Sequence, residues 1–237
     1  MRLNREIQRL KKSSPFYILQ ILLIKMKVLV ALDRDGTINV DQGYTGKDPQ
    51  WREKLQLCER VIDGIRKLKS DSKIDLCVVS NQAGVARGFV TLQRVDEVND
   101  AINQLLLDAH IDLRFWYTCP YVDSQYAREK GLRLPCEWVD DNNEDRKPSI
   151  GMLRRAANDF GYSLEFYDRI YVIGDKPSDV QTALNAKGIG IIVREDDNQK
   201  EVEEVQRWND RDEYRGRVKV AKDLEEAAKT ILREIAN

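Results

Sequence analysis

The stretch KVLVALDRDGT, residues 27–37, decides the fold class of this 237-residue chain. Lys27 to Leu32 has the length and apolar character of a buried strand. Two aspartates, Asp33 and Asp35, follow it directly, and Gly36 lets the backbone turn sharply there. A buried strand that ends in paired carboxylates predicts a polar site at the edge of a sheet, although D-x-D-G also occurs in ordinary turns.

The rest of the chain alternates apolar runs with segments of helical periodicity, which is typical of parallel strands joined by crossover helices. We expect helices around 61–68, after Thr91, from Ser149 to Gly161, from about Ser178, and after Asp223. Further strands are predicted at 74–79, 115–119, 170–173 and 189–193. The predicted fold class is therefore α/β, a doubly wound, Rossmann-like parallel sheet, in which ligands bind beyond the carboxyl ends of the strands.

Composition limits the possible partners and the location. The formal net charge is -1, so no global positive field favours nucleic acid, and we expect no nucleic-acid partner. Four cysteines without a disulfide pattern indicate a reducing cytoplasm. Residues 1–25 are basic and then apolar, but the apolar run is too short to cross a bilayer. We expect residues 1–25 to be an N-terminal extension of a domain that spans 26–237. We expect no stable membrane association, and the alternative is that the extension anchors the chain at a membrane surface. We expect the protein to be a monomer.

Other predicted strand and helix ends also carry polar residues. Ser80 and Asn81 follow the second strand, Arg146 and Lys147 precede Pro148 and a helix, and Asp175 follows the fourth strand. Each of these groups can also be interpreted as an ordinary polar turn or helix cap. Ser178 and Asp179, which follow Asp175, can likewise be interpreted as caps of the next helix. A carboxylate pair, a hydroxyl, a cation and a further acid at four separate ends nevertheless favour one shared site for phosphate chemistry.

These motifs resemble those of the haloacid dehalogenase-like phosphatases. DRDGT, SNQ, the K-P before a helix and GDKPSD match the four motifs of that family. ALDRDGTINVDQGYTG, SNQAGVARG, RKPSIGML and IGDKPSDVQTALNAKGIG resemble the subgroup of heptose-1,7-bisphosphate phosphatases and histidinol-phosphatase domains. The resemblance runs from about Met26 to the C-terminus and implies that family's sheet. Only 42 residues separate Thr37 from Ser80 and 64 separate Gln82 from Lys147, so we expect no large cap domain.

The resemblance also implies roles for individual residues. Asp33 would attack phosphorus, and Asp35 would protonate the leaving oxygen and then activate water, staying protonated at first because its side chain is not needed on the metal. Mg²⁺ would bind to Asp33, to the backbone carbonyl of Asp35 and to Asp175. The remaining roles are phosphoryl binding by Ser80, charge neutralisation by Lys147, and substrate contacts by Asn81, Arg87, Arg146 and Lys176.

The chain departs from the subgroup at its zinc loop, which is C-x-H followed by C-x-C. Here Cys119 is followed by Pro120 and Tyr121, and Cys136 by Glu137 and Trp138. Two thiolates do not complete a tetrahedral zinc site, so we expect no zinc and instead expect hydrophobic packing of Tyr121 and Trp138. The segment 120–145 should shape the substrate site.

The leading function is therefore a Mg²⁺-dependent phosphatase of a small phosphorylated sugar, with heptose 1,7-bisphosphate first and histidinol phosphate as the alternative. A nucleic-acid 3′-phosphatase is disfavoured because the chain has no basic stripe. A catalytically silent binding protein on the same fold is the alternative of another class.

Overall fold

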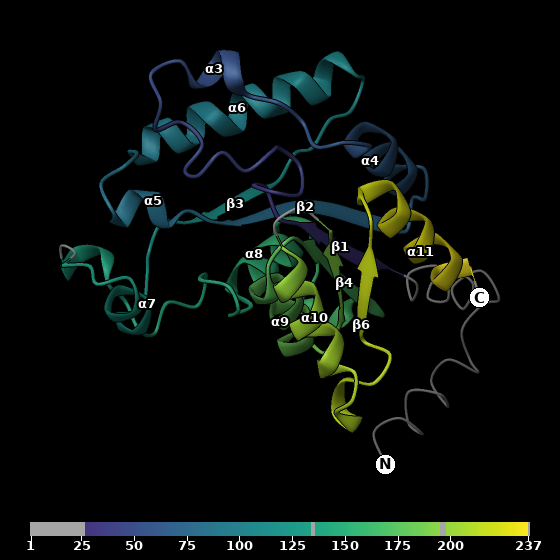
Figure 1. The fold of residues 1–237 in the computed structure, drawn as a ribbon. Coiled ribbons are helices and arrows are strands. Elements are labelled where there is room, and N and C mark those ends of the chain that lie inside the picture. The colour runs from purple at the N-terminus through teal and green to yellow at the C-terminus, as the bar shows by residue number, and fades with distance from the viewer. Residues whose placement is uncertain (1–26, 134–135, 195–197, 237) are drawn as a thin grey trace.

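The computed structural model describes residues 27–133, 136–194 and 198–236, so the predicted extension at 1–25 lies outside the described residues. The chain forms a parallel sheet of six strands in the order β3-β2-β1-β4-β5-β6 (Figure 1). This order confirms the predicted doubly wound sheet. The strands are β1 Val28–Leu32, β2 Ile74–Asn81, β3 Trp116–Cys119, β4 Arg169–Gly174, β5 Ile189–Val193 and β6 Val218–Ala221.

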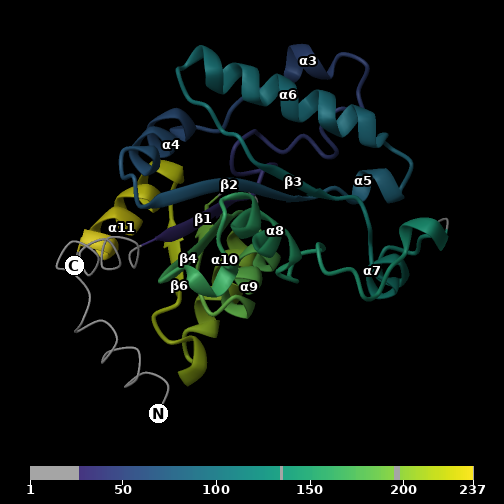
Figure 2. The same ribbon diagram turned by 180° about the vertical axis from the view of Figure 1, so that it is seen from behind.

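Helices cover both faces of the sheet, which explains why the strands are apolar runs rather than alternating patterns. All five residues of β1 are buried. Val30 and its neighbours pack with α4, α6 and α11 on one face, whereas Leu29 and Ala31 pack with α8 and α9 on the other (Figures 1 and 2). The bounds are α4 Val61–Lys69, α6 Leu92–Asp108, α8 Gly151–Asp159, α9 Pro177–Asn185 and α11 Leu224–Ala236.

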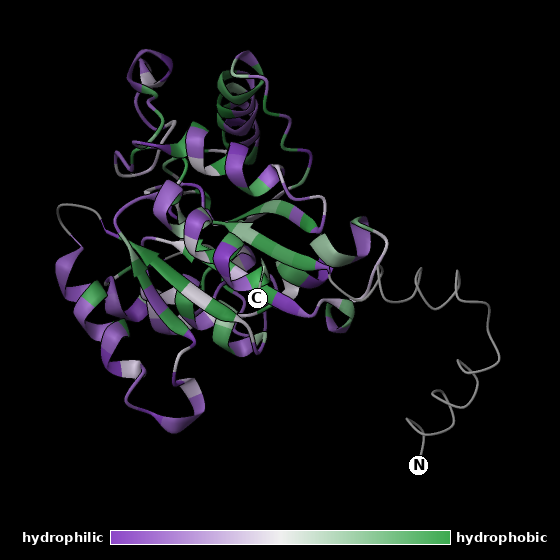
Figure 3. Cartoon of the chain, turned by 90° about the vertical axis from the view of Figure 1, so that its right-hand side faces the viewer, coloured by the Kyte–Doolittle hydropathy of each residue, from purple (hydrophilic) through white to green (hydrophobic). Residues whose placement is uncertain are grey.

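The sequence did not predict the last strand, β6, or the helix α10 (Gln199–Trp208), which packs against β6 and α9. Val202 and Val205 of α10 join a small apolar cluster that also contains Val180 of α9 and Val218 of β6. Hydrophobic residues dominate the strands, and hydrophilic residues lie on the outer sides of the helices (Figure 3). No helix among the described residues is long and apolar enough to cross a membrane.

Two of the predicted helix starts are confirmed by side-chain caps. Thr91 accepts a hydrogen bond from the backbone N–H of Arg94, and Asp223 accepts one from the N–H of Glu226. The predicted start at Ser149 is two residues early, because α8 begins at Gly151. In both caps the side-chain oxygen accepts a hydrogen bond from the backbone N–H three residues later. Such a cap can therefore be predicted from the sequence where a regular helix follows the cap residue.

Two connections at the carboxyl ends of the strands are long, residues 33–60 after β1 and 120–150 after β3, but among the described residues none of them forms a large cap domain. The helix α5 (Ala83–Ala86) follows β2, and the helix α3 (Trp51–Lys54) lies in the connection between β1 and α4. The segment after β3 contains only the helix α7 (Ser124–Glu129) and the short 3₁₀ helix Cys136–Trp138. In Figures 1 and 2, α7 stands away from the sheet on the same side as α5. Among the described residues, the connections at this edge of the sheet therefore consist of loops and short helices.

Candidate active site

Three aspartates from two strand ends meet at the carboxyl edge of the sheet. Asp33 follows β1, whereas Asp175 and Asp179 lie after β4 and in the first turn of α9. One carboxylate oxygen from each lies within 4.8 Å of the other two, and all three residues are buried. The structure thus brings Asp33 and Asp175 together, as the sequence predicts, and adds Asp179.

Lys147 is the buried cation of this cluster. Its Nζ lies 2.5 Å from Asp33 Oδ1 and 2.6 Å from Asp179 Oδ1, and it donates to the carbonyl of Val79 at 2.9 Å. Only 4% of the residue is exposed. Burial acts to lower the pKa of Lys147, but the two carboxylates outweigh it and raise that pKa above its usual value. Lys147 is therefore charged and oriented toward the Asp33 carboxylate.

Asp179 has two roles that sequence patterns do not separate. Its Oδ2 accepts a hydrogen bond from the backbone N–H of Lys176 at 3.1 Å, which is the helix-capping interaction that the sequence allows. Its Oδ1 lies against Lys147. Because only 1% of Asp179 is exposed, its charge acts inside the site and not at the surface.

The electrostatics of the cluster indicate a site for a divalent cation. Burial, with a smaller contribution from neighbouring carboxylates, raises the pKa of Asp33 to about 6 and that of Asp175 to about 8. The Oδ1 atom of Asp175 is buried and has no hydrogen-bond partner among the described residues. A hard cation with oxygen ligands would satisfy this atom and keep the acids ionised, so these residues fit Mg²⁺.

Two glycines make the close approach of the aspartates possible. Gly36 has a φ of +82°, and a Cβ placed there would lie 2.5 Å from Asp175 Oδ2. A Cβ at Gly174 would lie 2.2 Å from the carboxylate carbon of Asp179. Both positions therefore require the absence of a side chain for the cluster to close.

Asp35 points away from the three-aspartate cluster. Its Oδ2 accepts from Arg34 Nη2 and from Gln82 Nε2, both at 2.7 Å. Its Oδ1 accepts from Thr45 Oγ1 at 2.9 Å and from Asn39 Nδ2 at 3.0 Å. The side chain is thus held by four groups, and the binding of Mg²⁺ by the backbone carbonyl of Asp35 stays a prediction.

The protonation state of Asp35 differs from the expectation that it stays protonated. Burial acts to raise its pKa, but the charge of Arg34 and the hydrogen bonds from Asn39 and Gln82 outweigh burial and lower the pKa to about 2. Arg34 itself is fully buried, and its Nη1 donates to Asn99 at 2.9 Å. The sequence analysis did not single out Arg34, because a charged residue between two aspartates is normally exposed.

The two polar residues after β2 serve different parts of the site. Ser80 is buried, lines the cavity above the cluster, and accepts from Gln82 Nε2 at 2.8 Å. Asn81 binds the backbone of Lys147 on both sides, because its Nδ2 donates to the carbonyl and its Oδ1 accepts from the N–H, each at 3.0 Å. Asn81, predicted as a substrate contact, therefore holds the segment that carries the catalytic-site lysine.

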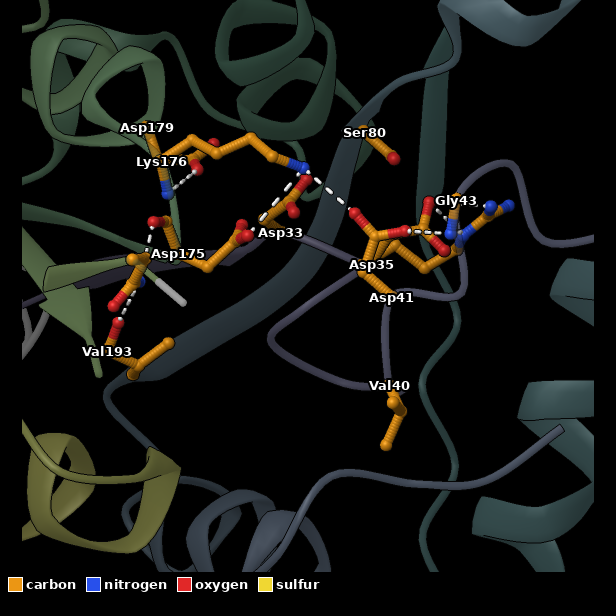
Figure 4. A network of polar contacts seen from close by, with 12 residues as sticks. Asp33, Asp35, Val40, Asp41, Gly43, Ser80, Asp175, Lys176, Asp179 and Val193 are labelled. Carbon is orange, nitrogen blue, oxygen red and sulfur yellow. Dashed lines mark hydrogen bonds and ion pairs between the residues drawn. The ribbon is translucent and has the colours of Figure 1, made fainter. Parts of the chain in front are cut away.

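The predicted substrate-binding cations line the outer part of the same cavity, which measures about 560 Å³. Lys176 Nζ lies between Asp41 Oδ2 at 3.2 Å and Asp175 Oδ2 at 3.6 Å (Figure 4). Arg146 Nε donates to Asp123 Oδ2 at 2.7 Å, and Arg87 contacts the hydroxyl of Tyr44. All three cations face the space in which a substrate would lie.

The described residues around Cys119 do not form a set of zinc ligands. Cys119 is fully buried, burial raises its pKa to about 11, and its Sγ lies 3.4 Å from Asn143 Oδ1. The rings of Tyr121 and Trp138 have centroids 5.5 Å apart, as the expected hydrophobic packing requires. The side chain of Cys136 lies outside the described residues.

A family model described as polynucleotide kinase 3 phosphatase matches residues 28–188. The D-glycero-beta-D-manno-heptose-1,7-bisphosphate 7-phosphatase of Yersinia pestis is 34% identical over 166 residues, which cover 70% of this chain and 79% of that protein. The D-glycero-D-manno-heptose-1,7-bisphosphate 7-phosphatase of Chlorobaculum tepidum is 34% identical over 175 residues, covering 71% and 79%.

Solved structures share the fold. A D,D-heptose 1.7-bisphosphate phosphatase from B. bronchiseptica, crystallised with magnesium and phosphate, superposes with a TM-score of 0.66 at 23% identity, covering 88% of this chain and 99% of that one. A putative HAD-like phosphatase from Mesorhizobium loti superposes with a TM-score of 0.58 at 29% identity, covering 71% and 73%. The sequence likeness and the fold likeness thus converge on one family.

Proposed function

Because the chain belongs to the haloacid dehalogenase-like phosphatases, we propose that it hydrolyses a sugar phosphate ester through an aspartyl-phosphate at Asp33, with Mg²⁺ bound beside it. The single observation that carries this proposal is the buried meeting of Asp33, Asp175 and Lys147 at the carboxyl edge of the sheet. A bound Mg²⁺ would supply positive charge next to the phosphoryl oxygens and would keep the aspartates ionised.

The residues of the chain can carry out both halves of the reaction. Asp33 is placed to attack phosphorus, forming an O–P bond while the bond to the sugar oxygen breaks. Lys147 offsets the negative charge that gathers on the nucleophile and the phosphoryl group, and the Ser80 hydroxyl can donate to a phosphoryl oxygen.

Asp35 is the candidate acid and base. It gives a proton to the departing sugar oxygen in the first half, and as an anion it takes a proton from the water that hydrolyses the aspartyl-phosphate. The contacts with Arg34 and Gln82 hold its carboxylate in the basic form, which suits the second half. A proton acquired together with the substrate is then needed for the first half.

The proposed substrate is D-glycero-D-manno-heptose 1,7-bisphosphate or a closely related sugar bisphosphate. The named relatives act on the 7-phosphate of this sugar and match over most of their length. The cavity of about 560 Å³ is within the usual size range for a small-molecule site. We also propose a cytoplasmic location, since the buried cysteines Cys77 and Cys119 are free thiols.

Two other phosphate esters remain as candidates. Histidinol phosphate is the alternative that the motif resemblance allows. The description of the matching family model favours removal of a 3′-phosphate from a nucleic-acid end, whereas the net charge of -1 gives no support for nucleic-acid binding.

The test is release of inorganic phosphate by the purified chain with Mg²⁺. The substrates are the heptose 1,7-bisphosphate, histidinol phosphate and a 3′-phosphorylated oligonucleotide, each compared with an EDTA control. We expect the highest kcat/KM with the heptose bisphosphate and none in EDTA. A folded protein that hydrolyses none of the three, nor p-nitrophenyl phosphate, would instead be a silent binding protein.

A further inference from the structure

The three aspartates of the cluster differ in what holds their side chains. Lys147 fixes two of them, because its Nζ lies 2.5 Å from Asp33 and 2.6 Å from Asp179. The Oδ1 atom of Asp175 is buried and accepts no hydrogen bond from the described residues. Its Oδ2 atom lies 3.6 Å from Nζ of Lys176, whose side chain is 52% exposed. The direction of the Asp175 carboxylate therefore depends mainly on the backbone that carries it.

The backbone of Asp175 lies just beyond the hydrogen-bonded part of the sheet. Gly174 is the last residue of β4, and it pairs with Ile192 at the end of the β4–β5 ladder. The amide of Asn198 takes over at the next residue, because its Nδ2 donates to the carbonyls of Asp175 and Val193, each at 2.9 Å. Figure 4 shows Val193, the last residue of β5, beside Asp175. One carboxamide thus joins the ends of β4 and β5 at an acid of the cluster.

The Asn198 side chain does not serve the helix that it precedes. Asparagine before a helix usually caps it by accepting from the first turn. Here the backbone carbonyl of Asn198 accepts from the N–H of Val202 at 3.0 Å, but its side chain makes no capping hydrogen bond to α10. The helix is instead anchored by Val202 and Val205, which pack against Val180 of α9 and Val218 of β6. A helix that is anchored elsewhere therefore presents the carboxamide of Asn198, a residue only 7% exposed, to the sheet.

We infer that Asn198 is a positioning residue for Asp175 as a ligand of Mg²⁺. This rests on the proposed function, because it takes Asp175 as a ligand of the cation. Groups that hydrogen-bond to a metal ligand orient it, and their loss typically lowers metal affinity about 10- to 100-fold. Asn198 acts on the backbone of Asp175 and keeps its carboxylate close to that of Asp33. Without this contact, part of the free energy of cation binding is spent on ordering the ligand.

The other end of α10 carries a matched contact that does not involve the cluster. Asn209 follows the last residue of α10, and its Nδ2 donates to the carbonyl of Val218 at 2.8 Å. Its Oδ1 accepts from the N–H of Gly216 at 3.1 Å and from that of Val218 at 3.2 Å. Val218 belongs to β6, at the edge of the sheet and two strands away from β4. Asn209→Ala therefore removes a similar contact between an amide and a strand without touching Asp175.

The test is calorimetric titration of Mg²⁺ into the metal-free full-length protein. We expect Asn198→Ala to raise the Kd for Mg²⁺ about tenfold or more, and Asn209→Ala to leave it within about twofold of the wild type. Both variants should lower the melting temperature, because each leaves a backbone carbonyl without its donor. Loss of affinity at position 198 alone separates positioning of the ligand from general stability.

The Mg²⁺ dependence of activity gives a second measurement. In phosphate release from p-nitrophenyl phosphate, Asn198→Ala should need about tenfold more Mg²⁺ for half-maximal activity. Its kcat at saturating Mg²⁺ should stay within about threefold of the wild type, because the cation then orders its ligand. Asn198→Ser is the milder variant and replaces the alanine variant if that one does not fold. Its hydroxyl can donate to one carbonyl and suits a helix start, so we expect a smaller rise in Kd.

Three results would overturn the role of Asn198 while the proposed function stands. These are an unchanged Kd for Mg²⁺ in the variants at position 198, an equal loss of affinity in Asn209→Ala, and a fall in kcat that no concentration of Mg²⁺ restores. A wild-type protein that binds no Mg²⁺ and keeps its activity in EDTA would contradict the proposed cation site itself, and the role of Asn198 with it.

Discussion

The three-aspartate cluster and the segment 120–145 differ in how their charges are compensated. In the cluster, Asp33 and Asp179 share Lys147, and all three are buried. In the segment 120–145, α7 is held by Asp123 and Arg146, and Lys130, the residue after α7, has no acidic partner among the described residues. We propose that the cluster carries out phosphoryl transfer and that the segment contributes to substrate choice.

This difference teaches that chemistry and selectivity can be changed separately in this chain. Groups in the cluster contact every substrate through the phosphoryl group that is transferred. Tyr126 of α7 lines the outer part of the cavity, so we expect it to contact only substrates that extend there. Substitutions in the cluster should therefore lower kcat for all esters, whereas substitutions on α7 should mainly raise KM for the larger ones.

The largest effect is expected for Asp33→Asn. An amide cannot attack phosphorus as a carboxylate does, so kcat should fall about 10³-fold or more for every substrate. Steady-state phosphate release from p-nitrophenyl phosphate and from the sugar bisphosphate measures this, and circular dichroism shows whether the fold is kept. A loss restricted to one substrate would mean that Asp33 acts in recognition.

Lys147→Ala should lower both activity and stability. Loss of the cation beside the transferring phosphoryl group should reduce kcat about 10²- to 10³-fold. It also leaves Asp33 and Asp179 buried without their partner, which should lower the free energy of unfolding by about 3 kcal/mol or more.

Lys176→Ala provides the matched comparison for stability in urea unfolding. The Lys176 side chain is 52% exposed and lies at the rim of the cluster. Its loss should cost about 1 kcal/mol or less. Equal losses of stability in the two variants would contradict the distinction between buried and exposed charges.

Mg²⁺ should stabilise the protein more at high pH than at low pH. In EDTA the pKa values of Asp33 and Asp175, about 6 and about 8, are above those of the unfolded chain, so the folded state binds more protons. Stability in EDTA should therefore fall as the pH rises from about 4 to 8, because folding then holds unpaired carboxylates. Bound Mg²⁺ offsets that loss.

The melting temperature with and without Mg²⁺, at pH 5.5 and pH 8, measures this effect. At a concentration about 100 times Kd, Mg²⁺ should raise the melting temperature at pH 8 by about 5 °C or more, and by less at pH 5.5. Asp175→Asn should remove most of the Mg²⁺ effect. A shift that is the same at both pH values would contradict the assignment of the cation to these acids.

The smallest effect is expected for Asp123→Ala, which removes the cap of α7 and the partner of Arg146. We expect KM for the sugar bisphosphate to rise about threefold to tenfold, with kcat for p-nitrophenyl phosphate nearly unchanged. Ser124→Ala is a milder control, since the Ser124 hydroxyl donates to Asp141 and does not line the cavity. A large loss of activity on both substrates would show that the segment also supports the cluster.

The sequence alone predicts the strands and the acids that follow them. Asp33 and Asp175 come directly after apolar runs, and parallel strands place their carboxyl ends at one edge. The sixth strand was not predicted, because Val218–Ala221 has only four residues and includes a lysine. The sheet order follows from contacts between segments that are distant in sequence, which local patterns do not contain.

Other features of the site depend on distant contacts that residue types do not indicate. The Asn81 side chain pairs with the backbone of Lys147, 66 positions later. Asp35 is held as an anion by a fully buried Arg34, and burial of an arginine cannot be inferred from an isolated motif. The position of Lys130 in the cavity depends on α7, a helix of six residues that the sequence did not indicate.

The most direct test of the central claim is to trap the covalent intermediate on Asp33. Rapid quench of the Asp35→Asn variant with ³²P-labelled substrate should capture an enzyme-bound phosphate, because loss of the base slows hydrolysis of the aspartyl-phosphate. The label should be acid-stable, released by hydroxylamine, and located by mass spectrometry on the peptide that contains Asp33. Turnover of the labelled substrate without any label on that peptide, or with label on another residue, would contradict Asp33 as the nucleophile.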